Sequence, residues 1–413
     1  MSEDLQTFRP RARAWLAENM PRAADATAGS TDGRDDEAWV RARELQRILF
    51  DGGFAGLCYP KEYGGQGLTP AHQRVFNEEA AGYEMPLLLN VPTFSICAPA
   101  ILDFGTEEQK QRYLPGVIRG DIVLVQFLSE PRGGSDLAGA VTRATRDGDV
   151  FMLNGSKIWS SNAYAADYGL CLARTDWDAP KHRGLTMFVV KVHQPGVEVR
   201  RIKQVNGNME FCQEFFDDVP IPASEVLGEV NGGWAVASRL LFHERTAVGG
   251  GSPYVSGPPG VERSGEAAPD LTSTARAGGR LGDPVVRELI GEDRVLERVA
   301  DQLAVRVTEG IRGGELPDST ASLLRLFMAT ANVRRTQIGL EVAGPRAVAW
   351  PTDEFRDGGS FGVHFLFRQG SSLGGGSTEM ARNLISERLL GMPREFAADR
   401  DVPFSQVRQS KTS

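Results

Sequence analysis

Apolar positions follow a helical period at both ends of the chain and a strand period in the middle. In the first part, Trp39, Leu45, Ile48 and Leu49 share one helical face. The segment TEEQ (106–109) has the form of a capping box at the start of a further helix. This part of the pattern predicts a helical domain over residues 1–122.

The pattern of apolar residues changes from a helical to a strand pattern between about residues 121 and 232. Short β-branched or aromatic runs such as DIVLVQFL, YGLCLART and GLTMFVVKV are bounded by turn residues, which is typical of strands. The pair Asn154-Gly155 lies between two such runs and predicts a tight hairpin turn. We therefore expect a small antiparallel β-domain over residues 123–232.

The helical period returns at Gly233 and predicts helices over 233–248, 284–312, 318–343 and 377–390. The fold class is thus mainly α with a middle β-domain, and residues 233–413 form a C-terminal helical bundle. The stretch 249–271 is rich in glycine and proline, so it predicts a long flexible loop. A functional loop and a surface insertion fit this stretch equally well.

Composition narrows the class of protein. The 413 residues are 41% hydrophobic and 24% charged, as in ordinary globular proteins of two or three domains. A net charge of -8 argues against nucleic acid as the main partner. We see no apolar run of about 18 residues, so we expect no membrane span. The N-terminus lacks a signal-peptide core, and the four scattered cysteines indicate reduced thiols in a cytoplasmic protein.

Several kinds of catalytic chemistry lack their motifs. The five histidines are far apart and no H-E-x-x-H occurs, so no catalytic metal is expected. No G-x-S-x-G elbow supports serine hydrolase chemistry. No G-x-G-x-x-G opens a βαβ unit, and the strands do not alternate with helices, so a Rossmann domain is not predicted.

One carboxylate lies on an apolar helical face. Trp234, Ala237, Leu241 and Val248 form a stripe along the helix predicted over 233–248, and Glu244 fills the gap in it. Burying a carboxylate is costly, so Glu244 needs a partner or a chemical role. Desolvation would suit it to abstract a weakly acidic C–H proton. From spacing alone, a buried Glu paired with a core Arg or a helix end is the stronger interpretation.

Two further segments suit a ligand. Between residues 127 and 163, the hydroxyls of Ser129, Ser135, Ser160 and Ser161 and the indole of Trp159 recur around tight turns, as a planar hydrogen-bonding cofactor such as a flavin would require. Each alone is more often a turn or core residue. Glycines 374–376 precede Ser377, a candidate N-cap whose helix N-terminus would suit an anionic or carbonyl-bearing ligand. An ordinary glycine-rich turn fits that segment equally well.

Together these motifs resemble the acyl-CoA dehydrogenase family. FLSEPRGGSDLAGAVTRA and NGSKIWSSNAYAADY are similar to its middle-domain signatures, and EFFDDVPIPASEVLGEVNGGW to the exit from that domain. STEMARNLISERLLGMPRE resembles the C-terminal signature, while YPKEYGGQGL and FGTEEQKQRYLPGVIRGD resemble the N-terminal domain. The resemblance spans most of the chain, with a gap at 249–283.

The resemblance implies an N-terminal helical domain, a β-domain and a C-terminal four-helix domain, with FAD as cofactor and an acyl-CoA thioester as substrate. A carboxylate would remove the α proton while hydride leaves the β carbon for the flavin. An electron-transfer flavoprotein-like acceptor and a homodimer or homotetramer are also implied. The residues carried over for the cofactor are Phe127, Leu128, Ser129, Gly134, Ser135, Trp159, Ser160, Ser161, Arg276, Arg280, Glu341, Gly344, Ser377 and Glu379. Those for the substrate are Ser135, Arg245, Gly375 and Gly376.

The chain departs from the family at the catalytic base. Many members carry a Tyr-Glu-Gly-Thr motif near the C-terminus, whereas the aligned residues here are Gly374-Gly375-Gly376-Ser377. Glycine cannot abstract a proton. A second branch, which includes isovaleryl-CoA dehydrogenase, keeps its base in a Glu-Arg pair after the β-domain, and Glu244-Arg245 matches that pair. The resemblance therefore favours Glu244 as the base.

Other departures leave alternatives open. The usual Arg-x-x-Phe-Gly segment reads ARAGGRLGDPVV (275–286), and Glu341 replaces a usual glutamine. The chain could therefore be a non-catalytic or half-site subunit of a heteromer. A flavin oxidase or monooxygenase on the same fold is a third hypothesis. The glycines around Gly375 favour a bulky, branched or ring-bearing acyl chain.

Overall fold

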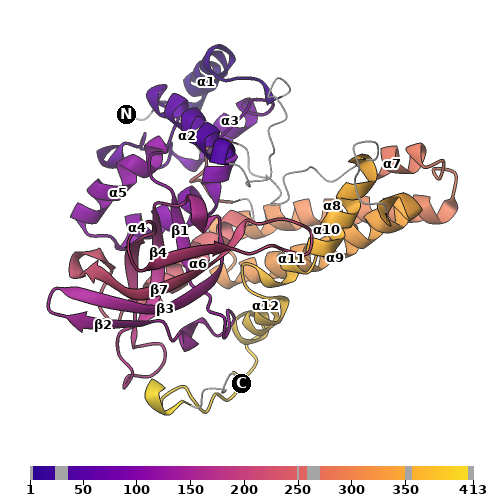
Figure 1. The fold of residues 1–413 in the computed structure, drawn as a ribbon. Coiled ribbons are helices and arrows are strands. Elements are labelled where there is room, and N and C mark those ends of the chain that lie inside the picture. Colours follow the sequence, from indigo (N-terminus) through magenta and orange to yellow (C-terminus); the bar gives the residue numbers. More distant parts are fainter. Residues whose placement is uncertain (1–2, 24–35, 249–250, 258–269, 349–355, 408–413) are drawn as a thin grey trace. The chain divides into compact units, whose positions relative to one another are not determined.

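The computed structural model describes residues 3–23, 36–248, 251–257, 270–348 and 356–407. Contacts divide the chain into two compact units (Figure 1). The first unit comprises Met1–Lys203, Met209–Gly260 and Phe396–Ser413, and the second comprises Gln204–Asn208 and Val261–Glu395. Each unit is described by itself below.

The first unit begins with the helices that the sequence predicts. Thr106 accepts a hydrogen bond from the backbone N–H of Gln109, and the Gln109 side chain accepts one from Thr106 N, so the capping box is confirmed. Trp39, Leu45 and Leu49 are buried on one face of the second helix. The helices are α1 (Leu5–Asn19), α2 (Asp36–Asp51), α3 (Pro70–Glu79), α4 (Ala98–Phe104) and α5 (Glu107–Arg119).

The expectation that no apolar run is long enough to span a membrane is wrong for one segment. Among the described residues, Leu87–Phe104 is apolar and long enough by composition, but 67% of it is buried inside the protein. It consists of η3 (Leu87–Leu89), η4 (Asn90–Cys97) and α4. The Tyr59 hydroxyl donates to Phe94 O and the Thr93 hydroxyl donates to Leu124 O. The segment is apolar because it forms core.

An eight-stranded sheet forms the centre of the first unit. Its order is β6-β7-β3-β2-β4-β5-β8, and β1 pairs with β4. The sheet is mostly antiparallel as predicted, but β1 runs parallel to β4, and β2 and β4 share a parallel bridge. The strands are β1 (Leu124–Phe127), β2 (Arg143–Asp147), β3 (Val150–Ser161), β4 (Tyr168–Arg174), β5 (Leu185–Lys191), β6 (Val197–Arg201), β7 (Phe211–Pro222) and β8 (Val226–Leu227).

The predicted hairpin turn at Asn154-Gly155 is wrong. Strand β3 runs straight through this pair, and the chain turns instead between β2 and β3 at Gly148, whose φ is 60°. Asn154 exchanges two hydrogen bonds with Asp218 on β7. A Cβ at Gly155 would lie 2.8 Å from the Cα of Thr142. The pair therefore serves a bulge and a close strand approach, which also favour glycine.

Helix α6 (Gly233–Val248) follows the sheet and coincides with the predicted helix. Contacts place it in the first unit, whereas the sequence division at 232/233 assigns it to the C-terminal bundle. It packs against η4, α4 and β5. Arg239 and His243 both bind the Asp103 carboxylate on α4, at 2.6 and 2.9 Å.

The stretch predicted as a flexible loop, 249–271, lies partly outside the described residues. Residues 251–257 are described and are anchored rather than free, while Asp270 and Leu271 form the N-cap and first residue of a helix. Ser95 donates to Tyr254 O, and Asn90 accepts from Ser256 N. The Tyr254 ring lies 4.7 Å from that of Tyr59. This part of the stretch is therefore packed onto the core of the first unit.

The second unit is helical. Helix α8 spans the predicted 284–312, and a 3-10 turn precedes α9 within the predicted 318–343. Helices α8, α10 and α12 each pack on α9, which makes it the central helix. The prediction did not include α7, α10 and α11. The helices are α7 (Leu271–Ala277), α8 (Pro284–Arg312), α9 (Ala321–Ala343), α10 (Arg356–Phe367), α11 (Gly370–Leu373) and α12 (Thr378–Leu384).

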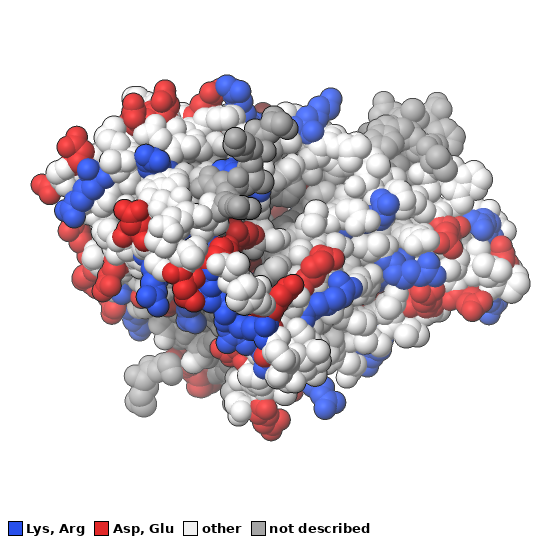
Figure 2. All heavy atoms as spheres, turned by 90° about the horizontal axis from the view of Figure 1, so that it is seen from below, with Lys and Arg blue, Asp and Glu red and all other residues white. Residues whose placement is uncertain are grey.

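Charge is mixed on the surface. Acidic and basic side chains are interspersed over the face that Figure 2 shows. A nucleic-acid surface gathers basic side chains on one face, so this face does not have that character.

Candidate active site

The residues predicted for the flavin meet where β1 ends and β3 passes. Ile158 N donates to Ser129 O at 2.9 Å, which joins the segment 127–129 to 159–161. Ser129 and Ser161 are half-buried. A Cβ at Gly134 would lie only 3.0 Å from Ser129 Oγ, so this glycine leaves the hydroxyl uncovered. The structure therefore brings these predicted residues together.

Trp159 has an unusual backbone and an exposed ring. Its φ is 66°, which is uncommon for a bulky residue and marks local strain. The register between β3 and β7 shifts between Ile158 and Ser160, so a bulge turns the indole outward. Its side chain is 55% exposed, with its ring edge-on to Phe211 at 5.9 Å. An exposed indole held in a strained bulge is suited to packing beside a flat ligand.

Two other residues predicted for the flavin point inward. The Ser160 hydroxyl is buried and donates to Glu214 Oε2 at 2.9 Å. The Phe127 ring is buried, 5.7 Å from that of Phe216. Only the backbone of these two residues remains available to a ligand, because the bulge in β3 and the alternation of β1 direct their side chains into the core.

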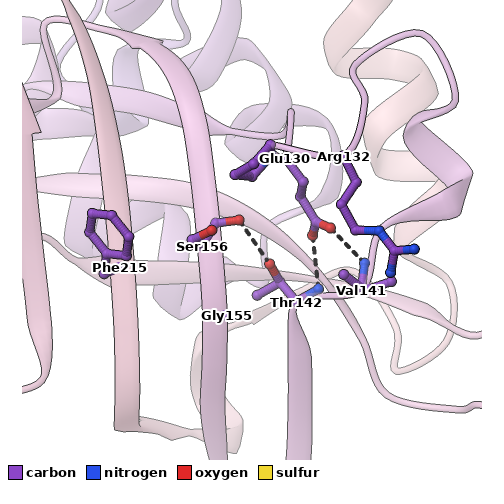
Figure 3. A pocket seen from close by; sticks show the side chains of 8 residues that line it. Glu130, Arg132, Val141, Thr142, Gly155, Ser156 and Phe215 are labelled. Atoms are coloured by element: carbon purple, nitrogen blue, oxygen red, sulfur yellow. Dashed lines mark hydrogen bonds between the residues drawn. The ribbon is translucent and has the colours of Figure 1, made fainter. Parts of the chain in front are cut away.

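A buried ion pair supports this junction from inside. The Lys157 ammonium donates to Glu130 Oε1 at 2.9 Å and to Leu128 O at 3.0 Å. The Glu130 carboxylate also accepts from Val141 N and Thr142 N at 2.7 and 2.8 Å (Figure 3). Burial would raise the pKa of Glu130, but Lys157 and the backbone donors hold it below its usual value. The turn after Ser129 is thereby fixed.

A second buried carboxyl faces the same lysine. Glu214 on β7 is the cross-strand partner of Lys157, yet the ammonium goes to Glu130. Glu214 Oε2 accepts from Ser160, while Oε1 has no partner among the described residues. Burial raises the pKa of Glu214 to about 8, and the Ser160 hydrogen bond offsets only part of that shift. Glu214 is therefore mostly protonated at neutral pH.

A cavity of about 380 Å³ lies beside this junction. Its lining residues come from the turn after Ser129, from β3 and β7, and from the segment leading into β2; they are Glu130, Pro131, Arg132, Val141, Thr142, Gly155, Ser156 and Phe215 (Figure 3). None of the residues predicted to bind cofactor or substrate lines it. This cavity and the predicted flavin surface are thus distinct.

Glu244 lies on the inward face of α6, as predicted. Its side chain is 7% exposed, and the buried face of the helix is centred on Val236, Leu240 and His243. The Gln126 amide of β1 donates to Glu244 Oε2 at 3.2 Å. Among the described residues, no salt bridge involves Glu244. The core-Arg pairing favoured by spacing alone is therefore not what the structure shows.

The ionisable neighbours of Glu244 are the half-buried Arg245 and the buried Cys97. Burial lowers the pKa of Arg245, and the Glu244 carboxylate opposes that shift. Burial raises the pKa of the Cys97 thiol well above its usual value, and Glu244 adds to this.

Strand β1 connects Glu244 to the residues predicted for the flavin, since it carries Gln126 and leads directly into 127–129.

Sequence reasoning missed Gln126, Glu130, Lys157 and Glu214. A signal existed for Glu214, because period-two alternation along β7 places it inward with Cys212 and Phe216. The other three have no comparable local signal, since their partners lie up to 118 residues away in the sequence.

In the second unit, three of the predicted cofactor residues meet. Arg280 Nη1 donates to Glu341 O at 2.7 Å and to Val342 O at 3.1 Å. A Cβ at Gly344 would lie 2.6 Å from the same nitrogen. Arg280 thus binds the last carbonyls of α9, a common site for a cation.

The predicted N-cap of the last helix is confirmed. Ser377 Oγ accepts from Met380 N at 3.3 Å, and α12 begins at the next residue. Gly375 and Gly376 have φ of 73° and 93°, a conformation that favours glycine. A Cβ at Gly376 would meet no atom within 4 Å. Glu379 and Arg276 are exposed.

The described residues contain no cluster of His, Cys, Asp and Glu able to hold a metal ion. The four cysteines are free thiols. Burial raises the pKa of Cys58 and Cys212 to about 11, so these thiols are inert at neutral pH.

Comparison with known proteins identifies the family. The models for the N-terminal, middle and C-terminal domains of acyl-CoA dehydrogenase match residues 2–121, 126–219 and 231–390. The chain belongs to the acyl-CoA dehydrogenase family. It is therefore an oxidoreductase of lipid metabolism in a family of flavoproteins, and the predicted fold is confirmed.

Individual relatives of this acyl-CoA dehydrogenase cover almost its whole length. Acyl-CoA dehydrogenase IpdE1 of Mycobacterium tuberculosis is 33% identical over 95% of this chain and 99% of its own. The solved Tcur3481-Tcur3483 steroid ACAD is 30% identical, with a TM-score of 0.75 over 95% and 99% of the two chains. The ChsE4-ChsE5 complex from Mycobacterium tuberculosis is 26% identical, with a TM-score of 0.69 over 96% and 100%.

The family implies FAD, and the first unit suits a flavin. The exposed indole of Trp159 and the hydroxyls of Ser129 and Ser161 lie at one strand junction. Gly134 keeps side-chain atoms away from Ser129. The flat indole can pack against the face of a heterocycle, and the serine hydroxyls can form hydrogen bonds with its polar edge.

Proposed function

We propose that this acyl-CoA dehydrogenase catalyses FAD-dependent α,β-dehydrogenation of an acyl-CoA thioester, with Glu244 as the base that removes the α proton. The observation that carries the proposal is the position of Glu244. It is a buried carboxylate on α6, held by an uncharged amide from the strand that leads into the flavin residues. We also propose, from the Glu244-Arg245 pair, that the chain belongs to the branch of the family that includes isovaleryl-CoA dehydrogenase.

The chemistry divides between base and cofactor. When bound, FAD accepts the hydride that leaves the β carbon. Trp159 would pack beside its ring, and Ser129 and Ser161 would bind its polar edge. Glu244 supplies a buried carboxylate that is positioned by the Gln126 amide, and a positioned carboxylate can take a proton from a bound substrate.

On the substrate side, we assign Ser135 and Arg245 to the thioester. Ser135 is exposed in the loop after Ser129, and Arg245 adjoins the base. Gly375, where many relatives have the base, and Gly376 add no side-chain bulk. Together with the likeness to a steroid ACAD, this favours a ring-bearing or otherwise bulky acyl chain.

Glu244→Gln tests the base. The variant should keep its yellow flavin but lose bleaching by an acyl-CoA substrate, with the reduction rate falling roughly a thousandfold or more. Anaerobic stopped-flow absorbance measures this rate. Glu225→Gln is the matched control, because Glu225 is equally buried but binds Arg112. Bleaching by Glu244→Gln at the rate of the control would eliminate Glu244 as the base.

A panel of thioesters tests the substrate class. We expect ring-bearing acyl-CoA compounds to bleach the flavin faster than butyryl-CoA or hexanoyl-CoA at equal concentration. A clear preference for short straight chains would refute the bulky-substrate proposal without affecting the role of Glu244. Reoxidation of the reduced flavin should be slow in air and fast with an electron-transfer flavoprotein, our proposed acceptor.

A second candidate is a subunit of a heteromeric dehydrogenase. Arg280, a candidate for the FAD pyrophosphate, is bound to backbone carbonyls of its own chain. One of the similar structures is named as a complex of ChsE4 and ChsE5, and another carries the joined name Tcur3481-Tcur3483. The visible spectrum and native mass of the purified chain decide: one FAD per chain in a homodimer or homotetramer favours the first proposal, and flavin-free protein favours the second. The free thiols fit a cytoplasmic location.

A further inference from the structure

We propose that Gln126 is a positioning residue for the base. Its amide holds Glu244 Oε2 and leaves the other carboxylate oxygen to receive the α proton. This inference rests on the proposed role of Glu244. The contact is a hydrogen bond of 3.2 Å from Gln126 Nε2 to Glu244 Oε2, between β1 and α6.

The backbone of Gln126 is rigidly placed. Gln126 pairs with Leu170 of β4, and its neighbours Val125 and Phe127 are buried. On the other side, the Thr93 hydroxyl accepts from Leu124 N and donates to Leu124 O, which ties β1 to η4. A side chain that leaves such a strand can fix the carboxylate it contacts.

Glu244 determines the orientation of the amide. Gln126 Oε1 is buried and has no hydrogen-bond partner among the described residues. The opposite orientation would set Oε1 against a carboxylate oxygen, so that two acceptors faced each other. The amide thus leaves its own oxygen unpaired and donates to Glu244, which indicates that this contact governs the arrangement.

An amide is a suitable partner for a base. It holds one carboxylate oxygen by a hydrogen bond without adding a second positive charge to that of Arg245. The ionisable groups that act on or adjoin Glu244 are Arg245 and the Cys97 thiol, while His243 is bound to Asp103. Gln126 is an uncharged hydrogen-bond donor beside these ionisable groups.

The test compares Gln126→Leu and Gln126→Glu with the unaltered protein by anaerobic stopped-flow reduction from pH 5 to 9. Loss of the donor in Gln126→Leu should slow reduction about tenfold at pH 7. It should also move the acidic limb of the rate profile up by about one pH unit, because the charged base has lost its hydrogen bond. Gln126→Glu should move the limb further, since two carboxyls then share the site.

Flavin content and melting temperature of each variant show whether it folds, and Gln111→Leu on the surface of α5 is the control. An unmoved acidic limb in both Gln126 variants, or a uniform fall in rate at every pH, would overturn the positioning role. If Glu244→Gln still bleaches, the proposed function fails instead. If Glu244→Gln is inactive while both Gln126 variants match the unaltered profile, only this inference fails.

Discussion

Glu130 and Glu214 lie on either side of one buried lysine and behave in opposite ways. Glu130 has the Lys157 ammonium and two backbone N–H groups, so its pKa lies below the usual value. Glu214 has one serine hydroxyl and an unpaired oxygen, and burial raises its pKa to about 8. Both are almost fully enclosed. The number of donors, rather than burial, therefore decides which carboxyl carries charge.

The hydrogen bonding of Glu244 resembles that of Glu214 more than that of Glu130. Neither Glu244 nor Glu214 forms a salt bridge among the described residues, and each accepts one hydrogen bond from an uncharged donor on another element, Gln126 and Ser160 respectively. Glu130 is satisfied too fully to act as a base, while Glu214 is sealed within the sheet. A carboxylate with one neutral donor retains an oxygen for chemistry. Glu244 on α6 is therefore the carboxylate that we propose as the base.

The largest effect is expected from Glu130→Gln. The substitution leaves the Lys157 ammonium buried without its counter-ion, which should destabilise the fold by about 3–5 kcal/mol. Urea unfolding monitored by circular dichroism measures the change. The double variant Glu130→Gln with Lys157→Met should recover part of the loss, because it removes the stranded charge. A loss below about 1 kcal/mol in the single variant would contradict the assigned ion pair.

Glu214 should affect the pH dependence of the free energy of unfolding in the opposite direction to Glu130, and Glu214→Gln tests this. In the native protein Glu214 stays protonated up to about pH 8, whereas in the unfolded chain it ionises near its ordinary value of 4.5. The native state therefore loses stability as pH rises from about 4.5 to 8. The variant lacks this loss, so relative to the unaltered protein it should gain of the order of 2–3 kcal/mol between pH 5 and pH 8.

The measurement is urea unfolding of both proteins at pH 5 and pH 8. Glu130 provides the contrast, since its lowered pKa makes its contribution present above the unfolded value and lost as pH falls. Equal pH trends for Glu214→Gln and the unaltered protein would show that Glu214 is ionised in the fold.

How far the sequence predicts this arrangement differs between the elements. The inward position of Glu244 follows from spacing alone, although the buried face is centred on Val236, Leu240 and His243 while Trp234 and Leu241 of the predicted stripe are half-buried. The caps at Thr106 and Ser377 also follow, because these signals lie within a few residues. The inward turn of Ser160 could not be predicted, since it depends on a bulge in β3. The failed hairpin at Asn154-Gly155 has the same cause: glycine suits a bulge as well as a turn.

Contacts between distant segments are the other missing part. In the sequence, Gln126 is an ordinary polar residue of a strand, and only the fold brings β1 against α6. Glu130 is likewise a turn residue in the sequence, and only the fold brings Lys157 of β3 to it. Period-two spacing along β7 does indicate that Glu214 is buried, but only its partners determine its charge. Local patterns therefore predict which side chains are enclosed more readily than what they do there.

Ser160→Ala gives a smaller effect that tests the side-chain donor to Glu214 seen among the described residues. Loss of this hydrogen bond should cost about 1 kcal/mol at pH 7, since a buried acceptor loses its partner. The variant also tests whether this bond steadies the neighbouring bulge. We expect a change in Trp159 fluorescence, measured against Ser156→Ala, a serine of the same strand whose hydroxyl does not bind Glu214. Unchanged stability and fluorescence would mean that the hydrogen bond between Ser160 and Glu214 stabilises neither the fold nor the position of Trp159.

The smallest effect extends the comparison to a cation in the second unit. Arg280 is satisfied by the carbonyls of Glu341 and Val342, as Glu130 is satisfied by backbone N–H groups. Arg280→Met should cost only about 0.5–1 kcal/mol, because the site is partly exposed and solvent can replace the guanidinium at the end of α9. Thermal unfolding measures this cost, and the FAD content of the same preparation tests the alternative role. If FAD content falls severalfold while stability is unchanged, Arg280 serves the cofactor rather than the helix end, with Arg298→Met on the exposed surface of α8 as the control.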